Sequence, residues 1–138
     1  MKFLIDTCVL LDVIEKREPF FDESYAFLKS LSSPSNNQGY LCVKQVCDLD
    51  YLARHFFHND KMARNFIEKI LKVFHLLDNR ADECLLALEA PMPDFEDALL
   101  SESAKTHGID FIVTRNLSDY QNSPVLAIDP KEALEKVN

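Results

Sequence analysis

Five aspartates stand at places where a folded chain could bring them together: Asp6, Asp48, Asp94, Asp97 and Asp119. Asp6 directly follows an apolar run, where a carboxylate is poorly hydrated unless it pairs with another group or a metal ion. Clustered carboxylates repel one another, and a divalent cation removes that repulsion. Oxygen ligands without His or Cys partners favour Mg²⁺ or Mn²⁺. Such ions can activate water for hydrolysis of a phosphodiester bond.

Each acid also has a simpler interpretation. Asp94 precedes an apolar helix and could act as its N-cap, a role that stays open beside metal binding. Asp97 could merely favour the helix dipole, although the apolar residues after it predict that its helix is partly buried. Asp119 could be a turn residue. Asp48 and Asp50 lie about 200° apart on a predicted helix, so only one of them can face a given site.

The elements that would position these acids alternate along the chain. Strands are expected at residues 2–6, 40–43, 74–77, 109–114 and 125–128. Helices are expected at residues 9–14, 22–31, 44–57, from a cap at Asp60 to 74, at 82–90, 94–107, and from Pro130 onward. Gly108 stands where a helix commonly ends. Connections long enough for crossovers predict an α/β fold, with a parallel sheet and helices on both faces.

In open parallel sheets, ligands bind outside the carboxyl ends of the strands. Asp6 ends the first predicted strand, and Asp48 lies a little over one turn into the helix after the second. Asp94 and Asp97 open the helix before the strand at residues 109–114, and Asp119 follows that strand. Acids from four parts of the chain can therefore point at one edge of the sheet.

Composition limits the alternatives. A chain of 138 residues with 47% apolar residues fits a single domain over residues 1–138. With 2 glycines it has no phosphate-binding glycine loop, and its 4 cysteines form no zinc spacing. The net charge of −8 is unusual for a protein that binds nucleic acid, unless bound cations offset part of it. Without a leader or a long apolar segment, a cytoplasmic protein with no membrane association is expected.

Several blocks of the sequence resemble PIN domains. Phe-Leu-Ile-Asp-Thr at residues 3–7, followed by Val-Leu-Leu-Asp at 9–12, is similar to the opening of that family. Residues 48–52 match the segment that holds its second acid, and residues 94–99 resemble its central acidic helix start. Ile-Val-Thr-Arg-Asn at 112–116, with Asp119 and Tyr120, is similar to its late strand and loop. The blocks occur in the family's order and span nearly the whole chain.

The resemblance implies a PIN-like, three-layer α/β/α fold with a central, mostly parallel sheet. It also implies an endoribonuclease that depends on Mg²⁺ or Mn²⁺. Many small members are VapC-like toxins of type II toxin–antitoxin pairs, which form homodimers and are silenced by a small antitoxin. The catalytic acids carried over from the family are Asp6, Asp48, Asp97 and Asp119. The metal ligands carried over are Asp6, Asp97, Asp94 and Asp119.

Substrate contacts are expected after the late strand, from Thr114, Arg115 and Asn116, with the arginine meeting an RNA phosphate. The chain departs from the family at Cys8, where Asn is usual. A thiol orients a neighbouring carboxylate or water poorly, so weakened catalysis is expected. A second hypothesis is therefore a PIN-fold module that binds RNA or a protein without cutting. The aromatic residues between 56 and 74 could supply an apolar dimer surface.

Overall fold

The computed structural model describes residues 1–138 and contains a single sheet of five strands. The strands are β1 (Lys2–Ile5), β2 (Gln38–Cys42), β3 (His75–Leu77), β4 (Phe111–Val113) and β5 (Ala127–Ile128). Their order is β3-β2-β1-β4-β5, and every neighbouring pair is parallel. The chain builds the sheet outward from β1 in both directions, so the carboxyl end of β1 is the topological switch point.

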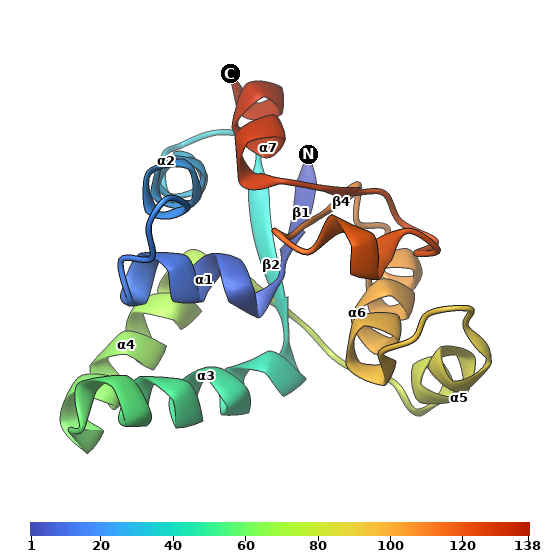
Figure 1. Cartoon of the computed structure of the whole chain (residues 1–138), viewed down its shortest axis with the longest axis horizontal. Helices are drawn as coiled ribbons and strands as arrows, with labels where there is room; N and C mark the ends of the chain where they lie inside the picture. Colours follow the sequence, from blue (N-terminus) through green and yellow to red (C-terminus); the bar gives the residue numbers. More distant parts are fainter.

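Seven helices flank the sheet, and a short 3₁₀ helix, η1 (Leu117–Tyr120), follows β4. The helices are α1 (Thr7–Ile14), α2 (Phe21–Leu31), α3 (Val43–Phe57), α4 (Asp60–Val73), α5 (Ala81–Glu89), α6 (Phe95–Thr106) and α7 (Pro130–Val137). Figure 1 shows α5 and α6 across the sheet from α1, α2 and α4. This arrangement confirms the expected three-layer α/β/α fold. None of the helices is long and apolar enough to cross a membrane.

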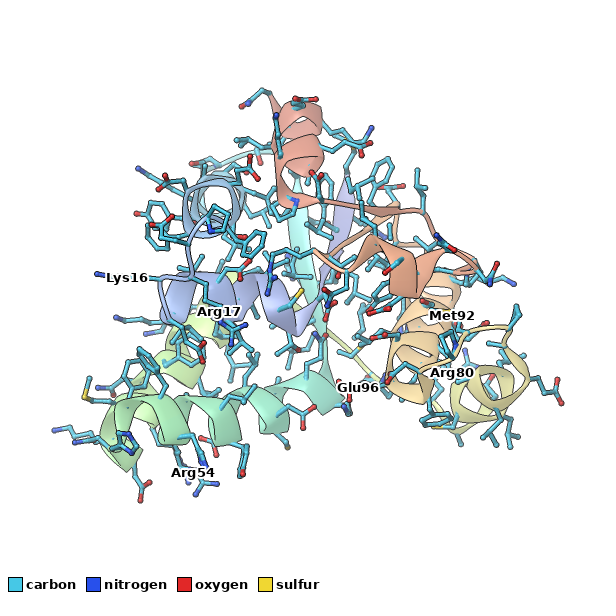
Figure 2. All side chains as sticks on the ribbon, viewed as in Figure 1. Lys16, Arg17, Arg54, Arg80, Met92 and Glu96 are labelled. Atoms are coloured by element: carbon cyan, nitrogen blue, oxygen red, sulfur yellow. The ribbon has the colours of Figure 1, made fainter.

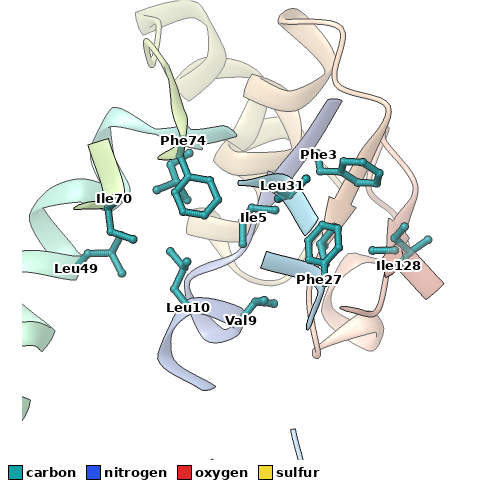
Figure 3. Close-up of a cluster of buried hydrophobic side chains, with 13 residues drawn as sticks. Phe3, Ile5, Val9, Leu10, Phe27, Leu31, Leu49, Ile70, Phe74 and Ile128 are labelled. Atoms are coloured by element: carbon teal, nitrogen blue, oxygen red, sulfur yellow. The ribbon is translucent and has the colours of Figure 1, made fainter. Parts of the chain in front are cut away.

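Two apolar clusters hold the layers together, one on each face of the sheet. Along β1, Phe3 and Ile5 belong to the first cluster and Leu4 to the second, as the alternation of side chains in a strand requires. The first cluster contains side chains from α1, α2, α3, α4 and α7 (Figure 3). The second is formed with α5, α6 and η1. Burial on both faces explains why β1 is apolar from Phe3 to Ile5.

Several local predictions are corrected by the structure. The strands β4 and β5 are shorter than expected. Asp60 does not cap α4; Asn59 does, through its Oδ1, which accepts a hydrogen bond of 3.0 Å from the Met62 backbone N–H. Gly108 ends α6 as predicted, with a φ of +64° in the left-handed region.

Candidate functional site

Asp6 lies at the switch point, directly after β1. Its backbone N–H donates to the carbonyl of Val113, which ties it to the end of β4. Asp6 occupies the N-cap position of α1, but its side chain makes no capping hydrogen bond. Instead Oδ2 accepts a hydrogen bond of 2.7 Å from the Thr114 hydroxyl, and the Cys8 thiol lies 3.5 Å from the same oxygen. Both donors are on Oδ2, so the Asp6 carboxylate is held on one side only.

Cys8 packs beside Asp6 and Thr114, with its Sγ 3.6 Å from the threonine hydroxyl oxygen. Burial raises the pKa of the Cys8 thiol to about 11, and the charge of Asp6 adds to the effect. The thiol therefore stays protonated at neutral pH. It serves only as a weak hydrogen-bond donor at the place where the resemblance leads one to expect an amide.

Asp94 and Asp97 open α6 with different roles. Asp94 caps the helix, because its Oδ1 accepts a hydrogen bond of 3.0 Å from the Asp97 backbone N–H. The Asp97 carboxylate accepts a hydrogen bond of 3.1 Å from the Tyr120 hydroxyl. Burial, together with the negative charges of Asp94, Asp6 and Asp119, raises the pKa of Asp97 to about 6. These four carboxylates thus share one electrostatic environment at the sheet edge.

Asp48 is brought to the same region but is already paired. The Lys44 ammonium lies 2.8 Å from Asp48 and 2.8 Å from Glu96, and so bridges α3 to the first turn of α6. Figure 2 shows Glu96 near the start of α3. Asp48 is not among the charges that shift the pKa of Asp97. Asp50 forms a separate ion pair with Arg54, so the two acids of α3 are separated as predicted.

Thr114, Arg115 and Asn116, the predicted substrate contacts, have three different environments. Thr114 is fully buried; besides donating to Asp6, its hydroxyl accepts a hydrogen bond from the Asn116 backbone N–H. Nε of Arg115 lies 2.6 Å from Oδ2 of Asp12, and its guanidinium carbon lies 4.4 Å from the ring centre of Phe20. Asn116 is exposed. Thr114 thus orients Asp6, and Arg115 is held by Asp12, for which no role was predicted.

Gln45, also without a predicted role, is fully buried below the site. Its Nε2 donates to the carbonyl of Ile5 at 2.9 Å and to the Thr7 hydroxyl at 3.2 Å. Its Oε1 accepts from the backbone N–H of Cys42 at 2.8 Å. Gln45 therefore fixes the end of β1 against the start of α3. Gln45 stands three residues after the N-cap Cys42, which is the spacing of a capping box. This spacing is a signal in the sequence that could have identified Gln45.

No three His, Cys, Asp or Glu side chains of the structure are arranged as they would be around a bound metal ion. The available donors nevertheless suit a hard divalent cation, because all of them are carboxylate oxygens. The raised pKa of Asp97 comes first from burial and then from the charges of Asp94, Asp6 and Asp119, which repel the Asp97 carboxylate. A cation of this kind would relieve that repulsion.

Comparison with known proteins agrees with this architecture. Among solved structures the fold is similar to VapBC2 from Rickettsia felis bound to a promoter DNA fragment, with a TM-score of 0.73, 17% identity, and coverage of 94% of this chain and 98% of the other. It is also similar to FitAcB from Neisseria gonorrhoeae, with a TM-score of 0.69, 21% identity, and coverage of 93% and 97%. A toxin–antitoxin complex from Klebsiella pneumoniae gives a TM-score of 0.67, 21% identity, and coverage of 92% and 96%.

No curated protein sequence matches the chain. The sequence model of the PIN domain matches residues 2–118. That match contains the acids at the end of β1, on α3 and at the start of α6, and the segment after β4 as far as η1. The chain belongs to the PIN domain family.

Proposed function

We propose that the protein is a metal-dependent endoribonuclease that hydrolyses RNA phosphodiester bonds, and that it is the toxin of a type II toxin–antitoxin pair acting in the cytoplasm. PIN domains are generally nucleases. The observation that carries the proposal is the placement of Asp6, Asp94, Asp97 and Asp119 together at the switch point, where burial and the charges of the other three acids raise the pKa of Asp97. An acid cluster at the ligand-binding edge of a parallel sheet suits metal-assisted phosphodiester hydrolysis.

Mg²⁺ or Mn²⁺ would be held by Asp6 and Asp97, with Asp94 and Asp119 beside them. When bound, such an ion supplies activated water and stabilises developing charge on phosphate oxygens. The protein's own contribution is to orient the ligands. The Thr114 hydroxyl fixes Asp6, and the Tyr120 hydroxyl fixes Asp97. Hydrogen bonds of this kind to metal-binding carboxylates tune both their position and their affinity for the ion.

An antitoxin needs a surface on which to bind, and a groove between α1, α2 and α4 supplies one. It has a volume of about 370 Å³, and nine of its twelve lining residues are apolar, among them Val13, Leu28 and Phe66. Lys29 and Lys69 also line it. This chemistry suits an amphipathic segment with acidic flanks. The solved structures with this fold include a toxin–antitoxin complex, which supports the same partner.

Homodimer formation is part of the same proposal. Large apolar side chains remain exposed on α5, where Leu85 is 66% and Leu88 is 71% exposed. An apolar surface built from such leucines on one short helix would suit contact with a second copy of the chain. A molar mass measured in solution by light scattering should correspond to two chains. Leu85→Asp should then lower that mass to one chain.

The nuclease proposal is tested with purified protein and diverse single-stranded RNAs. Cleavage should require Mg²⁺ or Mn²⁺, stop when the metal is chelated, and fall at least a hundredfold in Asp6→Asn and Asp97→Asn. Asp50→Asn is the matched control, because Asp50 is on α3 and pairs with Arg54 away from the cluster. Equal loss of activity in the control would contradict the assigned roles.

The alternative function is a PIN-fold module that binds RNA or a protein without cutting. Two observations favour it: Cys8 is only a weak donor beside Asp6, and Lys44 already neutralises Asp48. If wild-type protein leaves all RNAs intact with either metal, yet binds them in the same buffer, this alternative is supported and the nuclease is excluded.

A further inference from the structure

A second cavity, which is lined partly by polar side chains, lies at the same edge of the sheet as the acids. It has a volume of about 170 Å³ and is lined by Arg115, Leu117, Asp129 and Pro130, together with residues of the α2 region that include Phe20 and Glu23. Arg115 and Leu117 follow β4, and Asp129 and Pro130 follow β5, so the cavity lies at the carboxyl ends of these parallel strands. None of the five predicted acids lines it. Arg115 directly follows Thr114, which contacts Asp6, so the cavity is a neighbour of the candidate active site.

The guanidinium of Arg115 is fixed at the wall of this cavity. Asp12 binds its Nε at 2.6 Å, and Phe20 covers its flat face. The contact with Asp12 is an ion pair, and no group of the protein accepts a hydrogen bond from this guanidinium, although its side chain is only 18% exposed. Asp12 is fully buried and neutralises the positive charge. Arg115 is therefore suited to offer a planar pair of donors to the cavity, more than to attract a phosphate by charge alone.

The other polar side chains of the cavity are Ser24, whose hydroxyl already donates to Asp12, and the carboxylates of Glu23 and Asp129. Glu23 lies in the first turn of α2 and is exposed. Asp129 uses its Oδ1 to cap α7, accepting a hydrogen bond of 2.7 Å from the Glu132 backbone N–H, and this leaves its second oxygen available. Two carboxylates disfavour an anion in the cavity. They favour a neutral ligand that carries N–H donors on one side and acceptors on the other.

We propose that this cavity is a subsite for a guanine base of the RNA substrate. Guanine has two adjacent acceptors, O6 and N7, which match the two donors of an arginine. Its N1–H and N2–H₂ groups form an adjacent pair of donors for a carboxylate. Phe20, Leu117 and Pro130 supply apolar walls for the flat ring. A volume of 170 Å³ is below the range of about 300–1,000 Å³ for drug-sized ligands, and so suits one base without its sugar and phosphate.

This subsite rests on the proposed function in one respect only, that RNA is the ligand. It is tested by the binding of fluorescently labelled RNA hexamers to the full chain carrying Asp97→Asn, in Mg²⁺, by fluorescence anisotropy. The hexamers differ at one position, which holds guanine, inosine, 7-deazaguanine or adenine. Guanine should bind about tenfold tighter than adenine. Inosine lacks the N2 amine and 7-deazaguanine lacks N7, so each should lose part of that preference.

A variant pair links the preference to this cavity. Glu23→Gln removes a carboxylate that lines it, and should reduce the difference between guanine and inosine while leaving binding of the adenine hexamer unchanged. Asp22→Asn is the matched control, because Asp22 is exposed in the same helical turn but does not line the cavity. Equal binding of guanine and adenine, or the same loss of preference in both variants, would overturn the subsite.

The two proposals fail in different ways. If wild-type protein cleaves RNA without regard to guanine, the guanine subsite is wrong and the nuclease stands. If the Asp97→Asn protein selects guanine but wild-type protein cuts no RNA with either metal, the subsite stands and the nuclease is wrong. If no hexamer binds and none is cut, both proposals are wrong.

Discussion

Nε of Arg115 lies 2.6 Å from Oδ2 of the fully buried Asp12 and joins the segment after β4 to α1. The Ser24 hydroxyl donates to the same oxygen at 2.9 Å, so α2 takes part as well. Burial raises the pKa of Asp12, while the Ser24 and Arg115 contacts act in the opposite direction. Because Arg115 follows Thr114, this pair also helps to hold the hydroxyl that binds Asp6.

Removing one partner of the Asp12–Arg115 pair should lower the stability of the fold. Asp12→Ala leaves the arginine without its acceptor, and the expected loss is about 3–5 kcal/mol in the free energy of unfolding, measured with urea. Replacing both partners, as in Asp12→Leu with Arg115→Met, should recover most of that loss, since no uncompensated charge remains. Asp50→Ala breaks a more exposed pair and should cost about 0–1 kcal/mol. Similar losses for Asp12→Ala and Asp50→Ala would show that the buried pair contributes little.

Metal-free protein should become less stable as the pH rises through the pKa of Asp97. The folded pKa is about 6, above the ordinary value of 3.8, so the folded state binds this proton more tightly than the unfolded state. The resulting stability is complete below about pH 4 and is lost as the pH rises through about 6. Asp97→Asn should therefore match wild type near pH 4 and exceed it at pH 7. The expected excess is about 1–2 kcal/mol, after allowance for solvent screening.

The measurement is the free energy of unfolding from pH 4 to pH 7 in the presence of a chelator. Mg²⁺ provides the control, because it should stabilise wild type at pH 7 and have little effect on Asp97→Asn. A constant difference between the two proteins across this pH range would show that Asp97 is not electrostatically strained.

The fold could be predicted from the sequence because its main signals are local. Alternating apolar strands and amphipathic helices leave few arrangements other than a parallel sheet, and Asp6 and Asp97 were placed at its edge by chain order alone. The corrections come from side-chain pairings. Asn59 and Asp60 are both good caps, and only the backbone geometry selects Asn59. The pair of Lys44 and Asp48 follows the i, i+4 spacing of a helix, but the second contact of Lys44, with Glu96, joins helices far apart in sequence, and no periodicity encodes it.

Tyr120 should matter for metal affinity, because its hydroxyl donates to Asp97 and opposes the rise in that residue's pKa. Tyr120→Phe keeps the buried ring and removes only this hydrogen bond. Loss of an outer hydrogen bond to a metal ligand commonly weakens binding by about tenfold or more. Titration calorimetry with Mn²⁺ should show a loss of that size, and the pH at which binding is half-maximal should rise.

Tyr40→Phe is the matched control for this change. The Tyr40 hydroxyl donates to Gln38 at 2.9 Å, at the surface of β2 and away from the acids. This variant should bind Mn²⁺ like wild type. Equal affinities of all three proteins would show that Tyr120 only packs against α6.

We expect that exchanging Cys8 for asparagine raises activity, because a thiol is a poor donor for orienting the Asp6 carboxylate. The thiol, with its pKa raised to about 11 by burial and by the charge of Asp6, is a weak donor at 3.5 Å. An amide is a stronger donor and also offers an acceptor. Cys8→Asn should therefore increase the rate of metal-dependent RNA cleavage several-fold.

Cys8→Ser separates donor strength from the geometry of an amide, because a hydroxyl has nearly the size of the thiol but donates more strongly. If donor strength limits the rate, both variants should exceed wild type in initial rates at saturating Mn²⁺. If only Cys8→Asn is faster than wild type, the amide oxygen is required as well as the N–H donor. That result would indicate that the asparagine orients a neighbouring group besides Asp6. Unfolding in urea identifies a variant whose rate falls merely because asparagine does not fit between Asp6 and Thr114. A folded Cys8→Asn protein no faster than wild type would show that the thiol does not limit this site.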